Sequence, residues 1–516
     1  MVAAAFGAVS CKKYLNINNN PNSVASAGVN YVLPLAIVNT ATLESNLNDY
    51  GSQTVGYAAN AGGYGGFGSS WTYDYSPSQG ESNWDLGYQA LENFQYIINT
   101  SKGNADDANF DAAAKIMKAF VFQLLVDEFN DIPYDQALQG STYFTPKYDS
   151  AALIYPQLAN LLDSAIAEID ANPNATAIAS SSDPLFKGDM PSWKRFANSE
   201  KLRLIIRASG STTFSNQTFS SDGFLTTDAV VNPGYTEAQA SSGSQVNPSW
   251  ATWATDYNGS RVGQAWVPAY YVYGYYDGTK LTDPGRGAAV YFGWPLDSLN
   301  QLGAITLANS KTAPAAAGAW YSGSGAGKTA GNAIGVLKGP NMGEPLMLLA
   351  ESDFLQAEAD IRGILSGTAA TDFDNGIVAS FQYLYELPNL SLASGKDPAG
   401  DAAAYMTANA SSYLVNFSLA TTPAEKLEAI ITQKYIANNF INGEESWSEY
   451  RRTGYPVSSS LVLNNPYGSL ASLQSQATRP DHLPTRVPYP TSEAASNAAN
   501  VPQGISVYTS TIFWAK

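Results

Sequence analysis

The stretch that decides the fold runs from Asp111 to Phe129 and reads DAAAKIMKAFVFQLLVDEF. Its apolar side chains would fall on nearly every side of a helix. A helix without a polar face is buried on all sides, so this one must lie among other packed elements. The segment that follows offers such an element, because its apolar residues recur at helical spacing. These residues are Leu158, Leu161, Leu162, Ala165, Ile166 and Ile169.

Further helices are expected on both sides of a long irregular stretch. The expected helices cover 31–48, a segment from Trp84, 193–207, a segment from Glu344, and about 371–386, 399–414 and 423–441. Between them, the chain is rich in Gly, Ser, Thr, Pro, Tyr and Trp, which predicts loops and a few short strands. We therefore predict one mainly α domain of packed helix pairs over residues 31–516. Its helical parts are about 31–209 and 343–452, with a loop-rich insertion at 210–342 and a C-terminal coil at 453–516.

The composition excludes several classes of function. The 516 residues carry a net charge of −17, which disfavours nucleic acid as a partner because phosphate contacts need clustered Lys and Arg. A single Cys and a single His allow neither a disulfide framework nor a Cys/His metal site. His482 lies in a Pro-rich loop without a nucleophile elbow, so we do not expect it to be catalytic. We expect no metal and no cofactor.

The sole cysteine lies at the end of an apolar N-terminal run, MVAAAFGAVSC. This run is similar to the tail of a truncated signal peptide that ends at a bacterial lipobox, in which the cysteine carries a lipid. Ser10 fits cleavage before Cys11, whereas Ala8 replaces the usual Leu. We predict that residues 1–11 are this remnant, that Cys11 is lipidated and that the polar residues 12–30 form a tether. No other segment approaches the length of a membrane span.

One glycine-rich stretch, GSGAGKT from Gly323 to Thr329, is close to a phosphate-binding loop. That motif requires glycine where this chain has Ser322, and it also requires a strand before the loop and a helix after it. Both flanks are rich in Gly, Pro and small residues. We therefore interpret this stretch as a surface loop, and Lys328 as no nucleotide ligand.

Two predicted loop regions carry aromatic residues that would suit the binding of a neutral sugar. Sugars present apolar C–H faces and hydroxyl rims, and proteins hold them with aromatic rings and planar polar groups on anchored loops. An extended conformation of WTYDY would place Trp71, Tyr73 and Tyr75 on one side. The candidates for ligand binding are Trp71, Tyr73, Asp74, Tyr75, Trp250, Trp266, Tyr271, Trp294, Trp320 and Tyr321.

Several charged residues are better explained as structural ion pairs. Two glutamates seven residues apart share one face of a predicted helix, and paired arginines occur in two other predicted helical segments. A buried Arg–carboxylate pair needs both members, since a stranded charge costs about 3–5 kcal/mol. The candidates are Arg203, Arg207, Glu351, Glu358, Arg451 and Arg452. A site for an acidic sugar on the two C-terminal arginines is the alternative.

Segments in order along almost the whole chain resemble the SusD/RagB family of outer-membrane lipoproteins. The similar segments are CKKYLNINNNPN (11–22), LLVDEFNDIPYDQAL (124–138), WKRFANSEKLRLIIR (193–207), LTDPGRGAAVYF (281–292), ESDFLQAEADIRG (351–363), ITQKYIANNFINGEESWSEYRRTGYP (431–456) and RVPYPTSEAASNAAN (486–500). Three departures from the family pattern are Asn130 for Gly, Glu200 for Leu and an inserted Gly285.

The resemblance implies a SusD-like fold with tetratricopeptide-like helix pairs and a loop-rich second face. It also implies a cell-surface lipoprotein, anchored to the outer membrane by lipid alone. Such a protein captures a glycan or oligosaccharide and delivers it to a TonB-dependent barrel transporter of the SusC type. No catalysis is implied. Two alternatives remain: a glycoside hydrolase that uses a carboxylate pair, and a protein-interaction module that binds no glycan.

Overall fold

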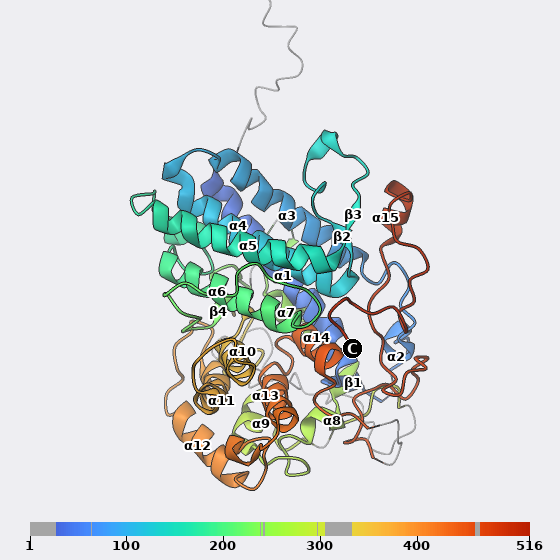
Figure 1. Cartoon of the computed structure of the whole chain (residues 1–516). Coiled ribbons are helices and arrows are strands. Elements are labelled where there is room, and N and C mark those ends of the chain that lie inside the picture. The colour runs from blue at the N-terminus through green and yellow to red at the C-terminus, as the bar shows by residue number, and fades with distance from the viewer. Residues whose placement is uncertain are drawn as a thin grey trace, which may run out of the picture.

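The computed structural model describes residues 27–516, apart from 63, 238, 241–242, 297, 305–332 and 460–464. Its long helices form two groups, one from each end of the chain (Figure 1). The N-terminal group is α1 (Val29–Thr54), α3 (Glu81–Ser101), α4 (Ala108–Phe129), α5 (Ala151–Ala171) and α6 (Met190–Arg207). The C-terminal group is α10 (Leu349–Ile361), α11 (Ala369–Tyr385), α12 (Pro398–Ala408), α13 (Pro423–Ala437) and α14 (Gly443–Thr453). The expected mainly α fold is confirmed.

The helix that opened the sequence argument lies at the centre of the N-terminal group. Almost every residue of α4 is buried, and the helix packs between α3 and α5. It ends at Asn130, whose left-handed φ of 64° is a conformation that glycine adopts without strain. The Asn130 side chain compensates, because its Oδ1 accepts a hydrogen bond from the Phe513 amide at 2.7 Å. The C-terminal coil is thereby joined to the end of α4.

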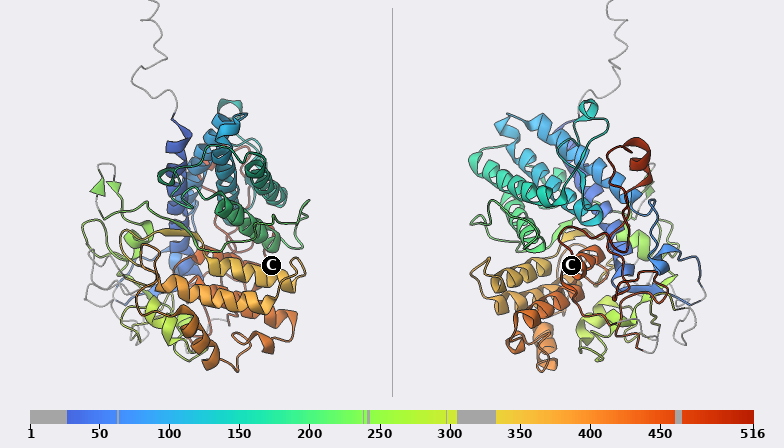
Figure 2. Two further views of the ribbon diagram at one scale, coloured as in Figure 1. Left: turned by 90° about the vertical axis from the view of Figure 1, so that its left-hand side faces the viewer. Right: turned by 45° about the vertical axis from the view of Figure 1, so that its right-hand side comes forward.

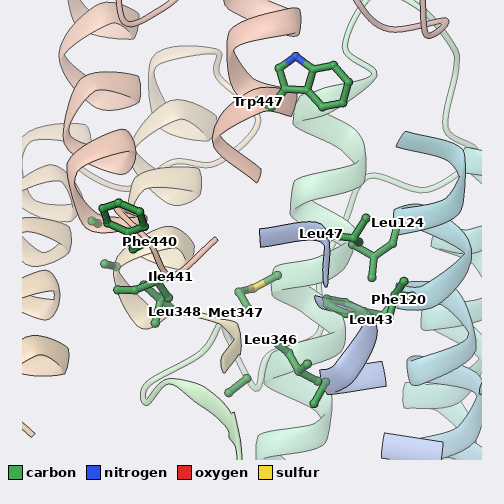
Figure 3. Packing of buried hydrophobic residues seen from close by; sticks show 14 of the residues in the cluster. Leu43, Leu47, Phe120, Leu124, Leu346, Met347, Leu348, Phe440, Ile441 and Trp447 are labelled. Atoms are coloured by element: carbon green, nitrogen blue, oxygen red, sulfur yellow. The ribbon is translucent and has the colours of Figure 1, made fainter. Parts of the chain in front are cut away.

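The core runs from one helix group into the other without a break. Figure 3 shows Leu43 and Leu47 of α1 facing Phe120 and Leu124 of α4. The same cluster continues through Leu346, Met347 and Leu348 to Phe440, Ile441 and Trp447. The two groups therefore share one continuous main core, beside a small second cluster of Leu202, Ile206, Leu355 and Ala359.

Helix α14 is the member of the C-terminal group that packs against α1, and it joins the two groups through buried charges (Figure 1). Glu445 is 3.5 Å from Arg203 Nη1, contacts Arg207 Nη2 and lies 2.6 Å from Lys434 Nζ. All four of these side chains are buried. Because α6 supplies both arginines and α13 supplies the lysine, one carboxylate of α14 connects the N-terminal helices to the C-terminal ones.

The insertion is attached to the helices by short antiparallel ladders. Strand β1 (Ala58–Asn60) pairs with β7 (Trp266–Pro268), and β4 (Ala229–Val231) pairs with β8 (Glu344–Met347). Two further ladders are β2 (Ile132–Pro133) with β3 (Tyr148–Asp149) and β5 (Gln239–Ala240) with β6 (Gly243–Ser244). The remaining α-helices of the described residues are the short α2 (Ser69–Thr72), α7 (Pro248–Trp253), α8 (Tyr270–Tyr273), α9 (Pro284–Val290) and α15 (Thr491–Ser496).

The observed helices differ in places from the expected ones. Helix α1 extends to Thr54, beyond the expected end at residue 48, and α12 ends at Ala408, short of 414. The segment expected as one helix to residue 441 is α13, which ends at Ala437. None of the helices in the described part of the chain is long and apolar enough to cross a membrane.

Candidate functional site

The sequence suggested an extended conformation for the first aromatic loop, but the structure shows that this loop is not extended. Residues 69–72 form the single turn α2, and Tyr73 follows it with a left-handed φ of 56°. The expected one-sided row of Trp71, Tyr73 and Tyr75 was therefore wrong. Phe67 precedes the N-cap Gly68, whose φ of 49° turns the chain so that Phe67 lies against Trp71 of α2. Their rings stack with centroids 4.8 Å apart and planes 16° apart.

The insertion supplies the ring that completes this group. Trp266 lies edge-on to Phe67, with ring centroids 5.0 Å apart. It also lies edge-on to Trp253, with ring centroids 6.5 Å apart. Strand pairing fixes this meeting, since Asn60 of β1 is opposite Trp266 of β7. Phe67, Trp71 and Trp266 are each half-buried. We call these three residues the aromatic group.

A cavity of about 410 Å³ lies against Trp266. It is lined by Asp49, Tyr64, Thr252, Trp253, Arg261, Val262, Gly263, Gln264, Ala265 and Trp266. Its wall thus combines aromatic rings with a carboxylate, a guanidinium and an amide. This set matches the needs of a polyhydroxylated ligand with apolar faces.

The turn that carries the polar wall is tightly built. Gly263 has a φ of 68°, and a Cβ there would lie 2.8 Å from the Trp253 carbonyl oxygen. The Val262 amide donates to the Ala254 carbonyl at 3.0 Å, and Asp256 Oδ1 accepts from the Ser260 amide at 2.8 Å. These contacts hold Arg261 and Gln264 at the cavity on a rigid loop.

Asp49 of α1 is the only carboxylate in the described lining of this cavity. Its Oδ1 accepts a hydrogen bond from Gln53 Nε2 at 3.2 Å, and Gln53 Oε1 accepts from Ser70 Oγ at 2.7 Å. Burial raises the pKa of Asp49 to about 6, and the hydrogen bond from Gln53 acts in the opposite direction. The carboxylate is therefore largely ionised at neutral pH and can accept hydrogen bonds from ligand hydroxyls.

Most of the other aromatic candidates lie in the core. Tyr73 is fully buried and its hydroxyl oxygen accepts from the Ser472 amide at 3.0 Å. Trp250 donates from Nε1 to Thr255 Oγ1 at 2.9 Å, and Tyr271 donates to the Val457 carbonyl at 2.8 Å. Tyr75 contacts Thr54 Oγ1 at 3.2 Å. Because these rings pack inside the protein and their polar atoms are paired internally, we assign them structural roles.

The remaining candidates lie away from the cavity lining or outside the described residues. Trp294 is half-buried and stacks on Tyr291, with centroids 6.2 Å apart. Asp74 is exposed on the loop after α2. Trp320, Tyr321, Lys328 and Cys11 fall outside the described residues. Of the sequence candidates, only Trp71 and Trp266 belong to the aromatic group.

The six charged candidates form buried ion pairs. Arg203 Nη1 is 3.4 Å from Glu351, and Arg452 Nη1 is 2.6 Å from Glu358. Arg207 contacts Asp127 of α4, and Arg451 Nη2 is 2.6 Å from Glu444 of α14. All six are buried. This geometry supports a structural role and leaves Arg451 and Arg452 inaccessible to an acidic sugar.

Sequence reasoning missed most of the polar wall. Asp49 and Gln53 lie on a helix that reads as core, and Tyr64 and Phe67 lie in a glycine-rich stretch that carries no spacing signal. The composition of residues 60–80 was the one available clue, because it marked an aromatic loop. Only the β1–β7 pairing reveals that this loop meets the insertion.

Comparisons with known proteins agree on one family. A SusD-like family model, described as starch-binding and associating with the outer membrane, matches residues 21–490. A SusD/RagB family protein from Bacteroides thetaiotaomicron has a similar structure, with 20% identity, a TM-score of 0.68, and coverage of 95% of this chain and 99% of that one. A chitin-binding SusD homologue from Flavobacterium johnsoniae shares 24% identity, with a TM-score of 0.64 and coverage of 94% and 96%. No curated protein matches the chain.

Proposed function

The chain belongs to the SusD-like family, and on that premise we propose that it binds a neutral glycan or oligosaccharide at the aromatic group and the adjoining cavity. Trp266 and the stacked pair of Phe67 and Trp71 would hold the apolar faces of sugar rings. Asp49 and Gln264 would accept hydrogen bonds from hydroxyls, and Arg261 would donate them. The observation that carries this proposal is that Trp266, which contacts the stacked Phe67 and Trp71, lines one cavity together with a carboxylate, a guanidinium and an amide.

The composition of the cavity favours binding over hydrolysis. A glycosidase places two carboxyl groups on either side of the scissile bond, about 5–10 Å apart. The described lining of this cavity contains one carboxylate, Asp49. The family description also names binding and no reaction. We therefore propose a binding protein that releases its ligand unchanged.

The finer parts of the role remain proposals that rest on the family. We propose that the protein works at the outer membrane of the cell surface, held by a lipid on Cys11. We further propose that it passes its ligand to a barrel transporter of the SusC type. Both proposals would be supported if such a barrel co-purifies with the full chain. In a Cys11→Ala variant, this co-purification should be lost from the membrane fraction only. A pull-down of the barrel by a protein that retains no glycan would instead favour a pure interaction module.

Calorimetry and affinity gels with chitin and starch oligosaccharides test the glycan site. Trp266→Ala should weaken binding by roughly 1–3 kcal/mol, about 5- to 150-fold, if the ring stacks on a sugar as aromatic side chains stack on nucleobases. Phe144→Ala is the matched control, because Phe144 is 81% exposed and lies outside the cavity lining. Equal affinity in both variants would reject this site. Release of reducing ends from the same oligosaccharides would favour the glycosidase.

A further inference from the structure

A second cavity, of about 490 Å³, opens where the two helix groups meet near β4. Figure 1 shows β4 between α6 and the α10–α11 pair, and the left view of Figure 2 shows the same two groups one above the other. The cavity is lined by Leu185, Phe186, Lys187, Ser192, Thr226, Thr227, Asp228, Val230, Asn232, Leu349, Ala379, Gln382, Glu386 and Leu390. It shares no residue with the cavity beside Trp266.

Six of the fourteen residues that line this second cavity are apolar, and five of these six are aliphatic. Leu185, Phe186, Val230 and Ala379 are buried side chains that turn toward it, and Leu390 at its rim is 42% exposed. Only one of the lining residues is aromatic, so the cavity offers no stacked rings to a sugar. An apolar body is the ligand portion that such walls accommodate.

The polar end of the cavity contains two carboxylates, those of Asp228 and Glu386, and the nearby Lys338 lowers the pKa of both. Asp228 Oδ1 accepts a hydrogen bond from the Leu349 amide at 2.7 Å, and its Oδ2 has no hydrogen bond with any described residue. Glu386 Oε1 accepts from Gln382 Nε2 at 2.7 Å. Burial raises the pKa of Asp228 to about 7; the Leu349 amide and Lys338 oppose this rise, and Glu386 adds to it.

The neighbouring lysines already have backbone partners. Lys187 Nζ donates to the Pro184 carbonyl at 2.9 Å. Lys338 Nζ donates to the Tyr383 carbonyl at 2.6 Å. Neither lysine lies within ion-pair distance of Asp228 or Glu386. Asp353 of α10 also faces Asp228 and has its own pKa raised to about 8 by burial and by Asp372 and Asp228. Asp228, Glu386 and Asp353 thus outnumber Lys338, whose own pKa burial lowers to about 8, and this balance favours a cationic ligand.

We propose that this cavity is a second binding site, for a small molecule with an apolar body and a protonated amine, whose ammonium is held by Asp228 and Glu386. The aliphatic walls take the body, and the free Oδ2 of Asp228 accepts the ammonium protons. A charge-assisted hydrogen bond of this kind is about twice as strong as a neutral one. A glycan at the aromatic group and an amine at this site would bind independently, because the two cavities have no lining residue in common.

Three matched probes test the class of ligand by calorimetry on the full chain. They are 2-phenylethylamine, 2-phenylethanol and 3-phenylpropionate, at about pH 8 where Asp228 is mostly ionised. We expect the amine to bind at least about tenfold more tightly than the alcohol, and the carboxylate not to bind. At about pH 5.5 Asp228 is mostly protonated, so amine affinity should fall at least about tenfold. An alcohol that binds as tightly as the amine would refute the cationic head group.

Variants separate this site from the glycan site. Asp228→Asn keeps an oxygen for the Leu349 amide but removes the charge, and it should weaken amine binding at least about tenfold while glycan binding stays unchanged. Trp266→Ala should leave amine binding intact. If Asp228→Asn fails to fold, Ala379→Leu tests the same cavity by filling it and should abolish amine binding. Amine affinity that survives in a folded Asp228→Asn or Ala379→Leu protein would overturn the proposal. Failure of every amine to saturate the protein at concentrations up to about 10 mM would overturn it too.

Discussion

Replacing Glu445 by Gln should destabilise the protein by about 3 kcal/mol. The change keeps the shape of the side chain and removes the carboxylate that Arg203, Arg207 and Lys434 share. Loss of one partner from a buried pair costs about 3–5 kcal/mol, because the other charge is left uncompensated. The lower end applies here, since Arg207 keeps Asp127 and Lys434 keeps a contact of 3.1 Å with Glu449.

Urea unfolding followed by tryptophan fluorescence measures this loss. The extrapolated free energy of unfolding should fall with little change in its dependence on urea, which reports the surface exposed. Glu92→Gln, on the exposed face of α3, is the control and should change the free energy by less than about 0.5 kcal/mol. A loss below about 1 kcal/mol in Glu445→Gln would refute the idea that α14 joins the two groups through charge.

The effect of Glu445 should also depend on pH in a defined direction. Burial opposes its ionisation, but Arg207, Lys434 and Arg203 hold the pKa of Glu445 well below its usual range. A lowered folded-state pKa gives stability that is present above the unfolded value near 4.5 and is lost as the pH falls. The difference between wild type and Glu445→Gln should therefore shrink in acid. A double-mutant cycle with Lys434→Met should show coupling of about 1–3 kcal/mol.

Three further predictions concern single residues. Burial raises the pKa of Glu344 to about 7, so the stability that its protonated form provides is lost as the pH rises through 7. At about pH 8, Glu344→Gln should therefore raise the free energy of unfolding by roughly 1–3 kcal/mol, as measured by urea titration. Gly263→Ala should weaken glycan binding at least about tenfold by calorimetry, because its Cβ would press on Trp253 and displace the turn. Asp49→Asn should weaken glycan binding at about pH 7.5 and have little effect at about pH 5, where the carboxyl of the wild type is already protonated.

The helical architecture could be predicted because its signal is local. Apolar residues at helical spacing mark α5, and the unbroken apolar character of α4 marks the centre of a helix group. Helix α14 has no comparable signal, since GEESWSEYRRT is mostly polar and charged. Its burial depends on partners from α6, α10 and α13 that are distant in sequence. Charged residues at helical spacing are ambiguous until those partners are known.

The site was predictable as a region and not as a set of side chains. Aromatic composition selected residues 60–80 and the insertion, which do meet through β1 and β7. It could not separate Tyr73, which points into the core, from Phe67, which stacks on Trp71. The difference arises from one helical turn and one left-handed residue. Such a local change in backbone conformation determines which side chains face a ligand, and it leaves no trace in the composition.

Helix α1 explains why the proposed glycan site can be rigid although its rings lie on short elements and loops. Its buried side places Leu43 and Leu47 against α4. Within the next two turns, Asp49 reaches the cavity and Gln53 reaches the loop after β1. A single helix of 26 residues thus spans the core and the site. Because a polar anchor on a packed helix is more precisely placed than one on a loop, Asp49 would fix the orientation of a sugar. The aromatic group would then contribute affinity and tolerate different rings.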